Sequence, residues 1–213
     1  MKAKTDDFHG LINTIHVNNW TFRGSYHQGK TSVEIDDITQ FSNLLSQIGF
    51  SESVESLATD GTTEVFQLSA SYETLNYFVR AELNHIHADF VFVPETDGYF
   101  ISTGYNYFPF TSYISYSKNV TEYEQPASDI PIGLSPQLDQ LAYGYLAIFD
   151  QLPVDSSEAF TLGTRWDLQA GLALKGEVSL IRGKADDNAF FTFDDADFDR
   201  KALLYLLALE WVF

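Results

Sequence analysis

Few residues in the chain combine the types and the spacing that chemistry requires. His85, His87 and Asp89 would point the same way on a strand, which is compatible with metal chelation. Two histidines and one carboxylate are a weak metal signature, and polar residues at the rim of a sheet explain them without a metal. The acidic segment 186–199 lacks the spacing of a calcium-binding EF-hand, so a solvated loop is expected there. We therefore predict no metal site.

The sequence also lacks the local motifs of common enzymes. It contains no cysteine, no glycine-rich phosphate loop after a strand and no G-x-S-x-G motif. A serine–histidine site assembled from distant strands would leave no such motif, but no serine is singled out. We therefore predict that the protein is not an enzyme and has no cofactor. The 30 Asp and Glu outnumber the 12 Lys and Arg, and a net charge of -18 argues against a nucleic-acid partner.

Charged residues recur in one pattern, at alternate positions of strand-like segments. Arg165 and Asp167, for example, alternate with Trp166 and Leu168. Each such strand has one face compatible with lipid and one face with Arg, Lys or Glu. In a barrel the polar face lines the lumen, where charged rings sort solutes. The predicted pore-lining residues are Arg23, Arg80, Glu82, Arg165, Asp167, Lys175, Glu177 and Glu210.

Nine strands are predicted to position these residues. They cover residues 8–17, 19–28, 63–74, 76–88, 97–107, 110–119, 158–168, 171–182 and 202–213. Short and long connections alternate strictly, as in outer-membrane barrels with short periplasmic turns and long extracellular loops. Two long connections contain helix patterns, one capped by Asp36 or Asp37 and ended by Gly49, the other starting at Ser135-Pro136. These helices either pack over the rim or fold inward and narrow a pore.

The last strand carries the strongest membrane signal. Its alternate residues form an apolar and aromatic row, namely Leu203, Tyr205, Leu207, Leu209, Trp211 and Phe213. A strand of about eleven residues is long enough to cross a bilayer at a tilt. If the short turns are periplasmic, all three tryptophans lie at one membrane boundary, as in an aromatic girdle. The predicted membrane-interface girdle is Trp20, Trp166, Trp211 and Phe213.

Several short phrases resemble a known family. The segments 161–168 and 172–178 and the ending Glu210-Trp-Val-Phe213 resemble the last three strands of Gram-negative outer-membrane porins, and residues 19–26 resemble an earlier strand. The resemblance implies an all-β, antiparallel transmembrane β-barrel through which small hydrophilic solutes or ions diffuse passively. It also implies recognition of the C-terminal strand by the barrel-assembly machinery, contact with outer-membrane lipid and lipopolysaccharide, and a homotrimer. The acidic loops favour cations.

The odd number of strands leads to a further expectation. Bacterial single-chain barrels have an even count with both termini in the periplasm. We therefore expect residues 1–213 to be an N-terminally truncated porin-like barrel domain, the C-terminal portion of a barrel of roughly 16 strands. Residues 1–7 are too polar and too short to supply another strand. Two alternatives remain, a non-transporting structural or adhesin barrel and a soluble all-β carbohydrate-binding protein.

Overall fold

The computed structural model describes residues 2–123, 125–150, 152, 154, 156–184 and 199–212. The described part of the chain forms nine strands and three helices. In chain order they are β1 (Lys2–Val17), β2 (Trp20–Glu34), α1 (Asp36–Ile48), α2 (Ser51–Ser56), β3 (Asp60–Glu73), β4 (Tyr77–Ala88), β5 (Glu95–Tyr107), β6 (Phe110–Glu122), α3 (Pro136–Asp150), β7 (Ser157–Gln169), β8 (Leu172–Gly183) and β9 (Lys201–Trp211).

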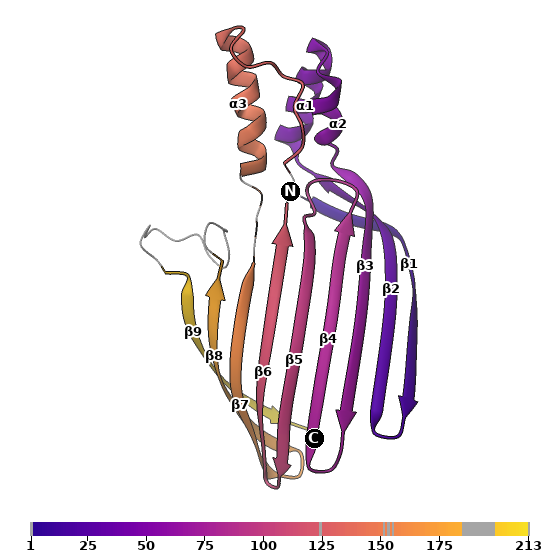
Figure 1. Ribbon diagram of the computed structural model, residues 1–213, viewed down its shortest axis with the longest axis vertical. Coiled ribbons are helices and arrows are strands. Elements are labelled where there is room, and N and C mark those ends of the chain that lie inside the picture. Colours follow the sequence, from indigo (N-terminus) through magenta and orange to yellow (C-terminus); the bar gives the residue numbers. More distant parts are fainter. Residues whose placement is uncertain are drawn as a thin grey trace.

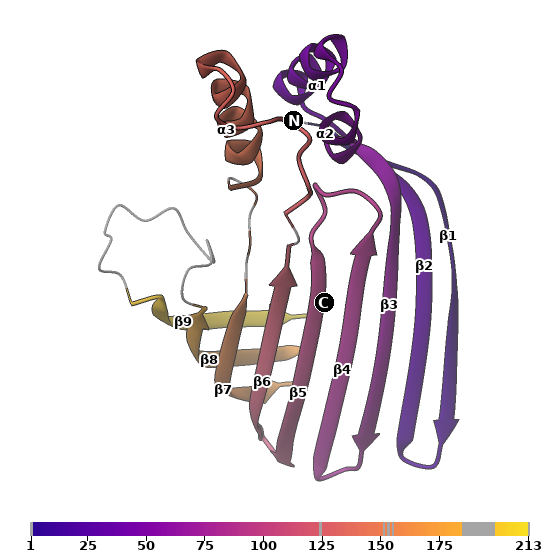
Figure 2. The same cartoon turned by 45° about the horizontal axis from the view of Figure 1, so that its top comes forward.

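All nine strands belong to one antiparallel sheet whose spatial order follows the chain, from β1 to β9 (Figure 1). β1 and β9 are its two edges, and no pairing joins them among the described residues. The sheet is strongly curved, with β7–β9 turned away from the plane of β3–β5 (Figure 2). The predicted all-β antiparallel fold is therefore confirmed, but the sheet is open rather than a closed barrel.

The nine predicted strands are all present, and several are longer than predicted at the end opposite the short turns. β1 begins at Lys2, so the polar residues 2–7 extend this strand instead of lying before it. They pair with the end of β2, where for example Lys4 is opposite Ser32. Backbone pairing does not require apolar side chains, which is why hydrophobic alternation underestimated the strand. A register shift between Asp6 and His9 accommodates the positive φ of Asp7.

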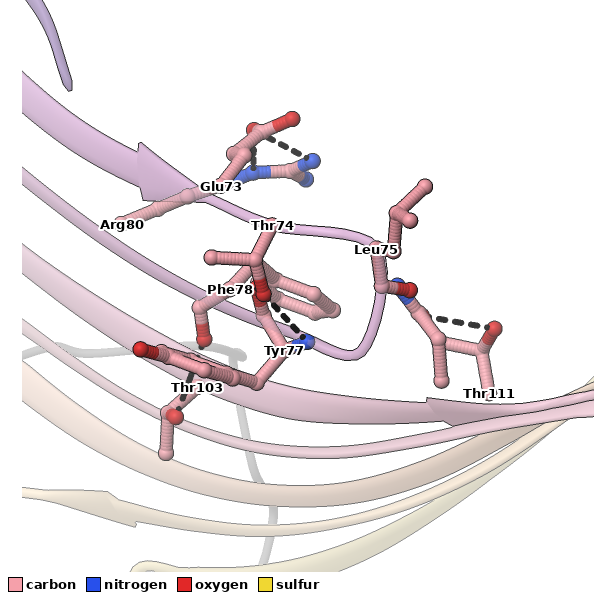
Figure 3. Close-up of polar contacts among 9 residues, drawn as sticks. Glu73, Thr74, Leu75, Tyr77, Phe78, Arg80, Thr103 and Thr111 are labelled. Atoms are coloured by element: carbon pink, nitrogen blue, oxygen red, sulfur yellow. Dashed lines mark hydrogen bonds and ion pairs between the residues drawn. The ribbon is translucent and has the colours of Figure 1, made fainter. Parts of the chain in front are cut away.

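The four short turns fix the register of the hairpins at one end of the sheet. In the β3–β4 turn, Thr74 Oγ1 accepts a hydrogen bond from the N–H of Tyr77 at 3.0 Å (Figure 3). Asn106 Nδ2 donates to the carbonyl oxygen of Leu75 at 3.2 Å, which ties this turn to the β5–β6 hairpin. Gly171 has a φ of 77°, and a Cβ there would lie 2.8 Å from a backbone oxygen of Val212. Only glycine fits this turn without strain.

The three helices gather at the opposite end of the sheet, where they form a cap (residues 36–57 and 126–150) (Figure 1). The buried apolar residues of the cap are Ile38, Leu45, Leu57, Ile130, Ala142, Tyr145 and Phe149. α1 and α3 were predicted from the sequence, and Gly49 ends α1 in the left-handed conformation. Among the described residues, no helix is both long and apolar enough to cross a membrane.

The start of α1 differs from the prediction. Its N-cap is Ile35, and no side chain caps the helix by hydrogen bonding. Asp36 and Asp37 lie in the first turn instead, where negative charge is favourable beside the N-terminal end of the helix dipole. α2 was not predicted, because its six residues are too few to show a helical period.

Candidate functional site

The sheet register places all eight predicted pore-lining residues on one face. Arg23 is opposite Ser69, and Ser69 is opposite Glu82 on the next strand. Towards the other edge of the sheet, Arg165 is opposite Lys175. Directly paired residues point to the same side of a sheet, so the register propagates one face across all nine strands. We call this polar side the inner face and its opposite the outer face.

The inner face is the concave side of the curved sheet. Side chains converge on a concave surface and spread apart on a convex one. Accordingly, Ser25, Ser102 and Ala173 on the inner face are only 4%, 7% and 2% exposed although no second layer packs on them in the described part of the chain. Arg165 on β7 also reaches Glu210 on β9 across the intervening strand. Converging side chains favour such a contact between next-nearest strands.

One charged cluster on the inner face is centred on Arg165. Its Nε lies 2.8 Å from Asp167 Oδ1, and its Nη1 contacts Glu210 Oε2. The three side chains are between 39% and 47% exposed, so water screens their interactions. A hollow of about 450 Å³ lies beside them and is lined by all three residues. The cluster can therefore contact a solvated ion.

A second charged pair lies next to this cluster on β8. Lys175 Nζ is 3.2 Å from Glu177 Oε1, and the hydroxyl of Tyr113 donates to the same oxygen at 2.6 Å. The Tyr113 ring lies against Gly163, where a Cβ would be 2.3 Å from a ring carbon. Glycine at position 163 thus allows the tyrosine to lie flat across β7 and to orient the Glu177 carboxylate.

A third group occupies the inner face of β3 and β4. Arg80 contacts Glu73 at 2.9 Å next to the β3–β4 turn (Figure 3). The guanidinium also lies 4.7 Å from the ring centroid of Phe78. Glu82 accepts a hydrogen bond from Gln67 Nε2 at 2.8 Å. Within the described ranges, no ion pair holds Arg23.

Glu73 belongs to the inner face although the sequence analysis did not single it out. It continues the alternate row Gln67, Ser69 and Ser71 to the last position of β3. With Glu73 included, the inner face carries four cations and five carboxylates, and all of them except Arg23 lie in the three groups. Neighbouring residues of opposite sign keep each group nearly neutral, while the total charge of the inner face is slightly negative.

The outer face is apolar and exposed over most of its width. Leu11, Leu162 and Leu207 are 73%, 56% and 76% exposed. Other exposed apolar residues of this face are Ile15, Phe22, Leu68, Leu83, Ile101, Ile114, Phe160, Leu203, Tyr205 and Leu209. An uncovered apolar surface that spans nine strands far exceeds what soluble monomers expose.

An aromatic row follows the outer face near the short turns. Rings are in contact from Trp20 to Tyr72 and on to Tyr77, with centroids 4.9 and 5.7 Å apart. At the other end of the row, Phe110 lies 5.7 Å from Trp166. Trp211 lies on the same face at the end of β9, whereas Phe213 lies outside the described residues. The predicted girdle of three tryptophans and Phe213 did not include Tyr72 and Tyr77, which extend the row.

His85 and His87 are stacked with ring centroids 6.4 Å apart, but Asp89 has a different role. His85 Nδ1 is 3.0 Å from Asp97 Oδ1, and His87 lies 3.8 Å from Glu95. Asp89 follows the end of β4 and accepts a hydrogen bond from the backbone N–H of Thr62 at 2.6 Å. In the part of the chain that the structure describes, no group of three or more such residues is arranged to hold a metal.

Comparisons with known proteins agree with this geometry at the level of the fold. No protein-family model matches the chain, and no curated protein matches it. The structure is similar to outer-membrane expressed OmpT of Vibrio cholerae, with a TM-score of 0.52 and 12% sequence identity. The sheet resembles the wall of an outer-membrane β-barrel. The likeness covers 85% of this chain and 46% of the OmpT chain, so the chain spans about half the length of its structural neighbour.

The similarity to OmpT corrects the prediction that the chain is not an enzyme. That prediction rested on the absence of local sequence motifs. In the antiparallel sheet of this chain, which resembles the wall of an outer-membrane barrel, side chains from strands far apart in the sequence share one face. An active site built in this way leaves no local motif. The absence of motifs therefore does not exclude catalysis on this fold, and the prediction is withdrawn.

Proposed function

We propose that the chain forms part of the wall of an outer-membrane channel for small hydrophilic solutes or ions. The opposite character of the two sheet faces carries this proposal. The outer face is apolar, and the inner face is polar with charges of both signs on β2, β3, β4, β7, β8 and β9. A membrane channel requires this combination, since lipid surrounds its wall and water fills its lumen.

Cations are the favoured solutes in this proposal. The inner face has one more carboxylate than cations, and the whole chain has a net charge of -18. A lumen with excess negative charge attracts cations and repels anions, and salt screens the effect. The alternate groups of opposite sign across the sheet would also orient polar solutes as they pass.

The assembly around the chain is part of the same proposal. In the described chain, the backbones of the edge strands β1 and β9 are each unpaired along one side. Further strands that pair there would close the wall. The residues of this chain then form one barrel domain together with those strands. Recognition of β9 by the barrel-assembly machinery, a homotrimer and contacts with lipopolysaccharide complete the proposed setting.

Conductance in planar lipid bilayers tests the channel. The complete barrel that contains this chain, refolded in detergent and added to a neutral bilayer, is expected to produce stepwise conductance with a reversal potential that favours cations in a salt gradient. Replacing Glu82 and Glu210 by Gln should move that potential towards anions. Glu64→Gln on the outer face, which accepts from Tyr26, is the matched control and should not move it. Insertion without conductance would contradict the channel.

A further inference from the structure

Three basic side chains form a row on the outer face at the cap end of the sheet. Lys118 on β6 is opposite Glu158 on β7. Glu158 is opposite Arg182 on β8, and Arg182 is opposite Lys201 on β9. The register therefore aligns four charged residues side by side across four strands, at a spacing of about 5 Å per strand. We call these residues the basic row.

The charge of this row is opposite to that of the chain as a whole. It contains three of the 12 Lys and Arg of a chain with 30 Asp and Glu. Glu158 is 3.8 Å from Arg182 and accepts a hydrogen bond from the Tyr116 hydroxyl at 3.1 Å. Lys201 is 3.1 Å from Asp199. Lys118 has no ion pair among the described residues, so the row keeps a net positive charge.

An apolar row lies directly below the basic row on the same face. Tyr116, Phe160, Leu180 and Leu203 are register partners in sequence across the same four strands. Phe160 and Leu203 are 51% and 52% exposed. Cationic groups above an exposed apolar surface match a molecule that has an anionic head and hydrocarbon tails.

The height of the basic row on the sheet fits the boundary of a bilayer. On β7, Glu158 lies eight residues before Trp166, which belongs to the aromatic row. At about 3.3 Å per residue, the two rows are roughly 26 Å apart along the strand. The apolar band of an outer-membrane barrel is about 25 Å tall, and strands cross it at a tilt. At a tilt of about 35–45° the two rows differ in height by roughly 19–22 Å. The flexible Lys and Arg side chains extend the few remaining ångströms, so their charged ends lie at the level of the lipid headgroups on the cap side.

We propose that the basic row and the apolar row below it form a docking site for a phosphate-bearing lipid. Lys118, Arg182 and Lys201 donate to the phosphate oxygens, and the acyl chains lie along Phe160, Leu180 and Leu203. Phosphate accepts several charge-assisted hydrogen bonds at once, which a row of cations provides. This inference rests on the proposed membrane location of the outer face, and it assigns a specific lipid site to β6–β9.

Calorimetric titration of the refolded full chain in neutral detergent tests the site. Short-chain phosphatidic acid is compared with phosphatidylcholine of equal chain length and with inorganic phosphate. Each basic residue near an anionic surface changes affinity by about fivefold. The double variant Lys118→Gln, Lys201→Gln should therefore lose phosphatidic acid affinity by about fivefold per lysine. The matched control Lys4→Gln, Lys30→Gln, which removes two lysines outside the row, should retain it.

A charge-preserving variant distinguishes the loss of positive charge from misfolding. Lys118→Arg with Lys201→Arg keeps both charges and should bind phosphatidic acid as the wild type does. Equal binding of phosphatidic acid and phosphatidylcholine by the wild type would overturn the proposal, as would equal losses in the row variant and its control. Inorganic phosphate binding as tightly as the lipid would show an anion site without a lipid role. Conductance is measured in neutral bilayers that contain no phosphatidic acid. The channel and the lipid site are therefore tested independently of one another.

Discussion

Arg165 on β7 and Glu210 on β9 form an ion pair across the strand that separates them. The same guanidinium also binds Asp167, so two carboxylates share a single cation. β9 is an edge of the sheet, and this pair joins its inner side to the interior strands. Arg165 therefore compensates the charge of both carboxylates in this cluster.

Replacing Arg165 by Gln should change ion selectivity more than stability. Each of its ion pairs is about half exposed and contributes only about 0–1 kcal/mol. Loss of the cation leaves Asp167 and Glu210 uncompensated, so the reversal potential in a KCl gradient should move further towards cations. Lys30→Gln on the outer face makes the same charge change as a control. An unchanged potential in Arg165→Gln would show that this cluster does not face the conducting path.

The contact between Tyr113 and Gly163 predicts a position-specific effect of alanine. In Gly163→Ala the new methyl group meets the tyrosine ring, which must move away from Glu177. We expect a loss of about 1–3 kcal/mol in unfolding free energy, measured by urea titration in detergent. At Gly176 a Cβ has no neighbour within 4 Å. Gly176→Ala should be neutral or stabilise by up to about 1 kcal/mol, and equal losses at both sites would refute the packing account.

The cap should lose stability in acid because of Asp129. Hydrogen bonds from the side chain and backbone of Ser53 and from the backbone of Glu52 lower the pKa of Asp129 below its usual value. The folded pKa is lower than the unfolded one, which is about 3.9. The stabilisation is thus complete above that pH and disappears as the pH falls through the folded pKa.

Proteolysis of the cap as a function of pH measures this effect. Asp129→Asn should make the cap more susceptible at neutral pH and remove the additional susceptibility between pH 4 and lower values. Glu55→Gln, at an exposed position in the last turn of α2, is the control and should behave like the wild type. If proteolysis of the cap in Asp129→Asn still increases with falling pH as in the wild type, other groups are responsible for the pH dependence.

The aromatic row predicts a common membrane depth for the three tryptophans. Variants that keep only Trp20, Trp166 or Trp211, with Phe at the other two positions, should be quenched most strongly by lipids brominated near the headgroup. The indole ring prefers this level because it is apolar with one polar N–H. If lipids brominated deep in the acyl chains quench one of the three tryptophans most strongly, that residue does not lie at the membrane interface.

The side chains that share a face of one strand were predictable, because the alternation depends only on neighbouring residues in the sequence. Alternation places Arg165 and Asp167 opposite Trp166 without knowledge of the remaining chain. The nine strands, the short turns and the two longer helices follow from such patterns. The position of the predicted polar residues on a single face also follows, once consecutive strands pair as hairpins.

Features that depend on distant residues could not be predicted. The ion pair of Arg165 with Glu210 depends on the register of β7, β8 and β9, which alternation does not encode. The contact of Tyr113 with Gly163 requires the register between β6 and β7. The basic row likewise appears only after residues from four strands are aligned. The withdrawn prediction about catalysis has the same cause, since it considered only local motifs.

The opposite environments of adjacent residues test the central claim most directly. The chain contains no cysteine, so single labels can be placed at Ile114→Cys and Ser115→Cys on the interior strand β6, on the outer and inner face. In vesicles, the label at position 114 should be quenched by lipid-embedded nitroxide and protected from aqueous iodide, and the label at 115 should show the reverse. Equal access of iodide to both positions would contradict a membrane wall with a water-facing inner surface.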